Sequence, residues 1–148
     1  MLRRLALTAA ASVAALSAAP TATAADTDPL PLPLSSLFTA PDQLTITVQG
    51  AGGDTDGTYE LKCGPAGGTH PNPAGACGRL EQRAAEGRDP FAPRQQGAMC
   101  TMQYGGPATA HVTGVWHGRP VDATYSRSDG CEVARWDAIV PVLPAVRA

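Results

Sequence analysis

Alternating apolar and polar residues predict two β-hairpins in this chain. Residues 44–48 (LTITV) place their apolar side chains on one face, and residues 58–63 (TYELKC) alternate in the same way. A period of two is typical of half-buried strands, so these runs predict a hairpin across a polar, turn-rich connection. Residues 108–112 and 121–125 alternate again, and His117-Gly118 between them suits a tight turn.

Helical spacing occurs in shorter stretches. Asn72 followed by Pro73 favours an N-cap and a first helical residue, and Gly87 marks the expected end of that helix. Three residues would then share one face: Cys77, Leu80 and Ala84. Residues 131–136 predict a second short helix. The pattern as a whole predicts an α+β fold, an antiparallel sheet with one or two short helices.

A last strand is expected at residues 139–142 (IVPV). Pro141 lacks the N–H that a sheet ladder uses, so it would confine this strand to an edge or force a bulge. The stretch before the first hairpin, residues 25–41, holds several prolines and no steady period, which predicts an extended N-terminal arm. The folded domain is therefore expected at residues 42–148.

Composition narrows the class of protein. The 148 residues are 43% hydrophobic and 16% charged, too apolar for a disordered tail, and 16 glycines with 14 prolines disfavour a helical bundle. The net charge of −2, with 11 Lys and Arg, gives no basic surface for nucleic acid, so no nucleic-acid partner is expected. No apolar run of about 20 residues occurs beyond the N-terminus, which excludes a multispan membrane protein.

The N-terminus has the layout of a secretory signal peptide. Arg3 and Arg4 precede an apolar run at residues 5–19, Pro20 breaks the run, and residues 22–24 (ATA) fit a cleavage signal. Residues 1–24 are therefore predicted to be removed, leaving a secreted, extracellular protein with no membrane contact. A membrane anchor is the alternative, although the run is shorter than the about 20 residues that span a bilayer.

Four cysteines predict two disulfides in an exported domain: Cys63, Cys77, Cys100 and Cys131. Four cysteines allow three pairings, and sequence order favours 63–77 and 100–131. A zinc site is the alternative, but no two cysteines have the close spacing of a zinc ligand pair.

No enzyme motif is present in the sequence, and neither a metal nor a cofactor is expected. His70, His111 and His117 fall in a Gly/Pro loop, on an outward strand position and in a turn, so all three are interpreted as solvated. Asp54 and Asp56 lie in a segment too short for an EF-hand loop, which is interpreted as a turn.

The segment at residues 97–105 (GAMCTMQYG) has the features of a substrate-like protease inhibitor. Such an inhibitor presents a rigid extended segment with one side chain for the primary specificity pocket of the enzyme. Met102 suits a roomy apolar pocket, Met99 suits a second one, and Cys100 would tether the segment. Two core methionines beside a buried disulfide fit the same spacing, and the residues alone leave both interpretations open.

Five segments in register resemble the Streptomyces subtilisin inhibitor family. They are LTITVQG, YELKCGPAGGTHPNPAGAC, AMCTMQY, VTGVWHGRPV and SDGCEVARW, and the resemblance runs from about residue 37 to residue 136. It implies a five-stranded antiparallel sheet, the cysteine pairing given above, and a homodimer formed by two stacked sheets.

The resemblance also implies a function and a site. It implies an inhibitor of secreted serine proteases of the subtilisin type, and by the Met side chain also of the chymotrypsin type. The reactive bond would be Met102–Gln103. Around it, the protease-contacting residues would be Met99, Cys100, Thr101 and Tyr104.

The sequence departs from the family pattern after the tyrosine. Gly105-Gly106 replaces a stiffer Asp-Pro, which predicts a looser loop. The alternative function is a non-inhibitory binding protein on the same fold, or a transglutaminase substrate acting through Gln95, Gln96 or Gln103.

Overall fold

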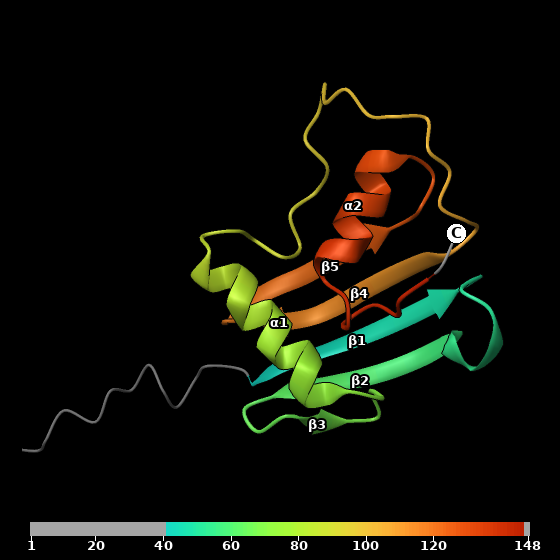
Figure 1. Ribbon diagram of the computed structural model, residues 1–148. Helices are drawn as coiled ribbons and strands as arrows, with labels where there is room; N and C mark the ends of the chain where they lie inside the picture. Colours follow the sequence, from blue (N-terminus) through green and yellow to red (C-terminus); the bar gives the residue numbers. More distant parts are fainter. Residues whose placement is uncertain (1–40, 147–148) are drawn as a thin grey trace, which may run out of the picture. The chain divides into compact units, whose positions relative to one another are not determined.

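Residues 41–146 are described by a computed structural model, and they form one antiparallel sheet with both helices on the same face (Figure 1). The strands are β1 (Asp42–Gln49), β2 (Gly57–Cys63), β3 (Gly67–Gly68), β4 (Thr109–Trp116) and β5 (Arg119–Tyr125), in the spatial order β3-β2-β1-β4-β5. The helices are α1 (Pro73–Ala85) and α2 (Gly130–Ala138), and a short 3-10 turn, η2 (Gly53–Thr55), joins β1 to β2. The predicted signal peptide (1–24) and the predicted arm up to residue 40 lie outside the described residues.

The predicted hairpins are confirmed. β1 pairs with β2, with Leu44 opposite Leu61, and β4 pairs with β5 across His117-Gly118. Both turn residues have positive φ, 49° and 72°, as the tightest hairpin turn requires. β1 also pairs with β4, so the two hairpins form one continuous sheet.

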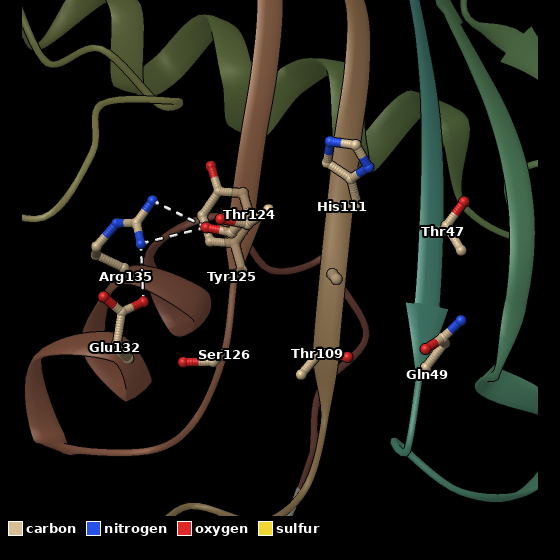
Figure 2. A pocket seen from close by; sticks show the side chains of 10 residues that line it. Thr47, Gln49, Thr109, His111, Thr124, Tyr125, Ser126, Glu132 and Arg135 are labelled. Carbon is tan, nitrogen blue, oxygen red and sulfur yellow. Dashed lines mark hydrogen bonds and ion pairs between the residues drawn. The ribbon is translucent and has the colours of Figure 1, made fainter.

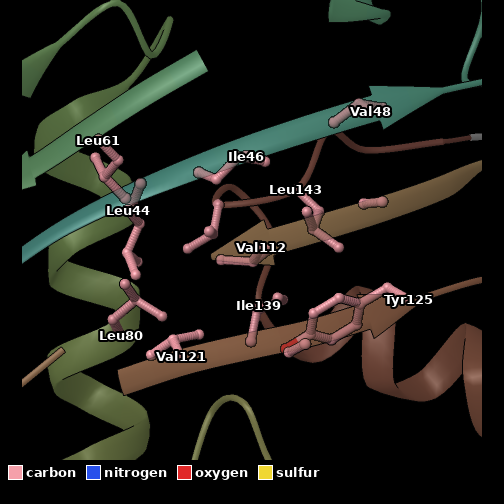
Figure 3. Packing of buried hydrophobic residues seen from close by; sticks show 14 of the residues in the cluster. Leu44, Ile46, Val48, Leu61, Leu80, Val112, Val121, Tyr125, Ile139 and Leu143 are labelled. Atoms are coloured by element: carbon pink, nitrogen blue, oxygen red, sulfur yellow. The ribbon is translucent and has the colours of Figure 1, made fainter. Parts of the chain in front are cut away.

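One face of the sheet carries the core (Figure 3). The inward side chains of β1 alternate with polar ones and are at most 1% exposed: Leu44, Ile46 and Val48. Leu80 of α1 and Trp136 of α2 are fully buried against the same layer. Each such side chain contributes about 1.5–3 kcal/mol by leaving water, so this layer fixes both helices on the sheet.

Helix α1 begins and packs as its sequence predicts. The side chain of Asn72 accepts a hydrogen bond from the Gly75 N–H (3.0 Å), Pro73 is the first helical residue, and Gly87 follows the last turn with φ 70°. Cys77 on its inner face is bonded to Cys63 at the end of β2, with 5.7 Å between the Cα atoms. The predicted pairing of this disulfide is therefore confirmed.

The predicted last strand at residues 139–142 is wrong. These residues form turns, in which the Val142 N–H donates to the Ile139 carbonyl. Ile139, Val142 and Leu143 are all at most 1% exposed, and a strand cannot turn two adjacent side chains to one face. Core burial therefore prevails over β-propensity in this segment.

The fifth strand is β3, which the sequence predicts as loop. Gly-Gly has a low β-propensity, so no pattern indicates it. Gly68 has φ 101°, and a Cβ there would clash with the Glu60 carbonyl oxygen. Only glycine allows this close pairing with β2, so the sheet is five-stranded as expected, with a different fifth strand.

His70 is also placed wrongly by the sequence interpretation, because it is buried at 7% exposure. Its Nδ1 accepts from the Asn72 N–H (3.1 Å), which leaves Nε2 to donate to the Val142 carbonyl (3.1 Å). His70 thereby joins the start of α1 to the C-terminal turns. No helix among residues 41–146 is long and apolar enough to cross a membrane.

Tyr125 gives the fold an alkaline limit. Its side chain is 3% exposed and its hydroxyl donates to the Pro90 carbonyl (2.9 Å). Burial raises the pKa of Tyr125 to about 12, with Arg135 lowering it and nearby carboxylates raising it. The unfolded chain ionises near pH 10, so this contribution of about 3 kcal/mol is complete below about pH 10 and is lost as pH rises through about 12.

We expect Tyr125→Phe to unfold with a flatter pH dependence between about pH 10 and pH 12, after an offset of about 1 kcal/mol at neutral pH for the lost hydrogen bond. Urea unfolding across this range measures the slope. Tyr104→Phe is the matched control, because Tyr104 is 65% exposed and its removal should leave the slope unchanged. An equal alkaline decline in Tyr125→Phe and the parent protein would contradict the assignment.

Candidate functional site

The chain between α1 and β4 forms the most prominent feature outside the sheet. Residues 86–108 contain no helix or strand, and they project beyond α2 before returning to β4 (Figure 1). Residues 97–105, the segment predicted to meet a protease and hereafter the 97–105 loop, occupy the far part of this excursion.

The methionines of the 97–105 loop point into solvent. Met99 is 101% exposed and Met102 is 95% exposed, so the interpretation as core methionines is wrong. Thr101, Gln103 and Tyr104 are exposed as well. Large apolar side chains fully exposed to water are unfavourable, and such exposed apolar surface is typical of interaction sites.

The main chain at the predicted reactive bond is also open. Among residues 41–146, the backbone N–H and C=O groups of Met102 and Gln103 have no hydrogen-bond partner. Both groups are therefore available to an extended partner strand, as main-chain recognition of a peptide requires.

A disulfide ties the loop to the start of α2. Cys100 and Cys131 are bonded, with 5.3 Å between their Cα atoms, which confirms the second predicted pairing. Asp129 caps α2, since its Oδ1 accepts from the N–H groups of Cys131 (2.9 Å) and Glu132 (3.1 Å). Its other oxygen binds Arg94 of the incoming chain at 3.0 Å. The disulfide therefore joins the loop to a helix end that is itself fixed.

A second attachment lies next to the disulfide. The Gly130 N–H donates to the Thr101 carbonyl at 3.0 Å. A Cβ at position 130 would meet Thr101 Oγ1, so Gly130 lets α2 approach the loop this closely while the Thr101 side chain keeps its rotamer. The residue immediately before Met102 is thereby held on the helix.

A third attachment holds the other side of the predicted bond. The Gly105 N–H donates to the Arg127 carbonyl (2.8 Å), and the Gly105 carbonyl accepts from Arg127 Nε (2.9 Å). Gly105 is buried, and a Cβ there would lie 2.5 Å from Val133 Cγ2. The prediction that Gly105-Gly106 loosens the loop is therefore wrong at Gly105, which is among its most constrained residues.

Arg127 is 4% exposed, and the sequence interpretation missed it. Its Nη1 donates to Asp137 Oδ1 at 2.7 Å, and its guanidinium lies over the Trp136 ring at 5.8 Å from the centroid. An arginine between two serines in a polar turn ordinarily lies in solvent. Its position four residues before Cys131 is the only signal in the sequence that could have placed it near the loop.

The remaining histidines are exposed but paired. His111 lies 2.7 Å from Asp122 and His117 lies 3.0 Å from Glu81. The His117 N–H also donates to Asp42, so one ligand-capable atom from each of these three residues lies within 4.8 Å of the others. The contacts of His117 form a hydrogen-bonded cluster at the β4–β5 turn, with partners on α1 and β1, away from the 97–105 loop.

The outer face of the sheet, opposite the core, is polar and hollowed near β5 (Figure 2). Threonines line it from three strands, namely Thr47, Thr109 and Thr124. At its edge, Arg135 donates to Glu132 (2.8 Å) and to the Thr124 carbonyl (3.4 Å). None of these groups touches the 97–105 loop by any of the described contacts.

Comparison with known proteins gives a consistent result. The sequence profile of the family described as subtilisin inhibitor-like matches residues 40–128. Subtilisin inhibitor-like protein 1 of Streptomyces cacaoi is 39% identical over 108 residues, which is 68% of this chain and 94% of that protein. Protease inhibitor SIL-V5 of Streptomyces luteoverticillatus is 37% identical over 100 residues, 64% of this chain and 90% of that protein.

A solved structure is also similar. It is the crystal structure of Streptomyces caespitosus sermetstatin in complex with Bacillus licheniformis subtilisin. The match has a TM-score of 0.41 and 33% identity, and it covers 65% of this chain and 91% of that chain.

Proposed function

This chain belongs to the subtilisin inhibitor-like family, and from that membership we propose that it inhibits subtilisin-type serine proteases through the Met102–Gln103 bond. The protein is not itself an enzyme under this proposal, because the protease supplies all catalytic groups. The observation that carries it is the exposure of Met102 (95%) on a segment attached to the scaffold on both sides.

The proposed contacts follow the order of residues in the 97–105 loop. Met102 fills the primary specificity pocket and Met99 a second apolar pocket. Cys100 and Thr101 lie along the acyl side of the bond, and Gln103 and Tyr104 lie along the leaving side. The free main-chain groups of Met102 and Gln103 support this arrangement, because they can pair with the enzyme without breaking any contact among the described residues.

The proposed mechanism uses a bond that can be broken and remade. The protease serine attacks the Met102 carbonyl carbon, and the protease histidine passes the serine proton to the Gln103 nitrogen as the peptide bond breaks. The new amine stays near the acyl-enzyme, because both chain ends remain attached to the inhibitor. Attack of that amine on the ester carbonyl then competes with water and restores the intact inhibitor.

Export to the extracellular space is part of the proposal. Two disulfides within the described residues, with no free cysteine there, support an oxidising compartment. The charged and then apolar start of the sequence supports a cleaved signal peptide.

We further propose that the protein is a homodimer formed by two outer sheet faces. Both helices lie on the core side of the sheet, so no helix of the described residues covers the outer face (Figure 1). Outward residues of the central strands include Thr45, Thr47 and Thr113, whose small side chains would let a second sheet approach closely.

A titration of subtilisin with residues 25–148 tests the function. We expect stoichiometric loss of activity, and in the aged complex a cleaved fraction whose new N-terminus is Gln103. Rapid digestion without inhibition would overturn the proposal and favour a non-inhibitory binding protein or a transglutaminase substrate. Cleavage elsewhere, with inhibition, would overturn the assignment of the bond alone.

Met102→Lys tests the primary residue. Trypsin carries a carboxylate in its specificity pocket, so we expect about a hundredfold tighter trypsin inhibition and a comparable loss towards subtilisin. Met99→Lys is the matched control, because Met99 is equally exposed but lies three residues before Met102. Equal gains towards trypsin in both variants would contradict the role of Met102.

Sedimentation equilibrium tests the dimer. We expect twice the chain mass for the parent protein, and the monomer mass for Thr45→Arg, because the symmetric interface would bring two arginines together. Ala85→Arg, at the exposed end of α1, should remain dimeric. A monomeric parent protein would refute this arrangement.

A further inference from the structure

We infer that Arg127 is a positioning residue that holds the segment on the leaving side of the Met102–Gln103 bond, so that this bond can be resealed after cleavage. The inference rests on the proposed function and assigns a part of it to one side chain.

Both attachments that bracket the bond come from one short segment of the scaffold. Gly130 binds the Thr101 carbonyl on the acyl side, and Arg127 binds Gly105 through both its carbonyl and its side chain on the leaving side. Cys131 adds the disulfide to Cys100. Residues 127–131 therefore hold the chain at Thr101, the residue before Met102, and at Gly105, two residues after Gln103.

The acyl and leaving sides of the reactive bond differ in the attachments that would remain after cleavage. On the acyl side, the disulfide is covalent and keeps Met102 near α2 whatever the hydrogen bonds do. On the leaving side, no covalent bond plays this part. Among the described contacts, the hydrogen bonds that hold the stretch between Gln103 and β4 are those of Arg127 with Gly105.

Arg127 is well placed for this role because its guanidinium cannot move freely. It is buried at 4% exposure, it donates to Asp137 at 2.7 Å, and it lies over the Trp136 ring. A planar fork can donate from Nε to a carbonyl and from Nη1 to a carboxylate at the same time, which a lysine ammonium cannot reproduce. Arg127 thus links Gly105 to α2, the helix that also holds the acyl side.

Resealing depends on where the new amine can go. Gln103 is two residues from Gly105, so an anchored Gly105 keeps the Gln103 nitrogen within roughly 7 Å of its attachment. Without the anchor at Gly105, the new N-terminal segment is free as far as β4, and its amine samples a much larger volume. The effective concentration of the amine at the acyl-enzyme falls accordingly, and water competes better.

The test compares Arg127→Gln with the parent protein under conditions in which both cleavage and resynthesis of the Met102–Gln103 bond can be followed. Intact and fully cleaved inhibitor are each incubated with catalytic amounts of subtilisin until the ratio of cleaved to intact protein is constant. We expect Arg127→Gln to raise this ratio about tenfold, because the Gly105 carbonyl then loses its charged donor and only the main-chain hydrogen bond from the Gly105 N–H still holds this segment. We also expect slower resynthesis from the cleaved form and faster turnover of the complex.

Two variants separate positioning from charge and from general stability. Arg127→Lys keeps the positive charge beside Asp137 but loses the fork, so it should behave like Arg127→Gln. Arg135→Gln removes a neighbouring arginine that stacks on Tyr125 and, among the described residues, makes no hydrogen bond to the 97–105 loop, so it should match the parent protein in the cleavage ratio. Thermal unfolding of all variants shows whether a change in the cleavage ratio merely follows a loss of overall stability.

The outcomes distinguish this inference from the proposed function. Inhibition by the parent protein with an unchanged ratio and resynthesis rate in Arg127→Gln would overturn the inference and leave the function intact. Failure of the parent protein to inhibit would overturn the function itself.

Gly105→Ala provides a second test if Arg127→Gln does not fold. Its Cβ would lie 2.5 Å from Val133 Cγ2 and 3.1 Å from Arg127 Nε, so it should push Gly105 away from the arginine without removing the arginine. It should raise the ratio as Arg127→Gln does. An unchanged ratio in a folded Gly105→Ala protein would likewise overturn the inference.

Discussion

The bond between Cys100 and Cys131 is the constraint on which the exposed site depends. The chain from residue 86 to residue 108 has no helix or strand of its own, so its shape comes from where it is attached. The disulfide attaches it to the first turn of α2, and the Gly130 hydrogen bond to Thr101 then fixes its direction. Closing a loop of this size also removes freedom from the unfolded chain, which stabilises the fold by about 3–4 kcal/mol.

The rest of the fold serves to hold α2 still. Trp136 is fully buried between α2 and the sheet, and its indole N–H donates to the Pro144 carbonyl at 2.8 Å. The C-terminal turns pack Ile139 and Leu143 into the same core, and His70 joins them to the start of α1. A close-packed core of this kind leaves α2 little room to move. The low freedom that tight docking requires therefore originates well away from the exposed methionines.

The sequence predicts the parts of this structure that arise from local periodicity. The strands, the capped helix α1 and the disulfide pairing follow from alternation, from Asn72-Pro73 and from cysteine order. Three features could not be foreseen in this way, because long-range packing decides them. Residues 139–142 form turns that bury their side chains in the core and do not join the sheet. Gly67–Gly68 pairs with β2 because it lacks side chains. Arg127 is buried by contacts with residues distant in the chain. The 97–105 loop was located by its residues, whereas its solvent exposure required the structure.

The exposure of Met99 and Met102 has a chemical consequence of its own. A thioether in full contact with water is open to oxidants, and its sulfoxide is polar and bulkier than the parent side chain. Such a group is poorly suited to an apolar pocket, whereas the scaffold, whose core contains no methionine among its buried residues, would keep its packing. If the proposed function holds, peroxide would therefore weaken binding of the protease while leaving the fold intact, and a sulfoxide reductase would reverse the change.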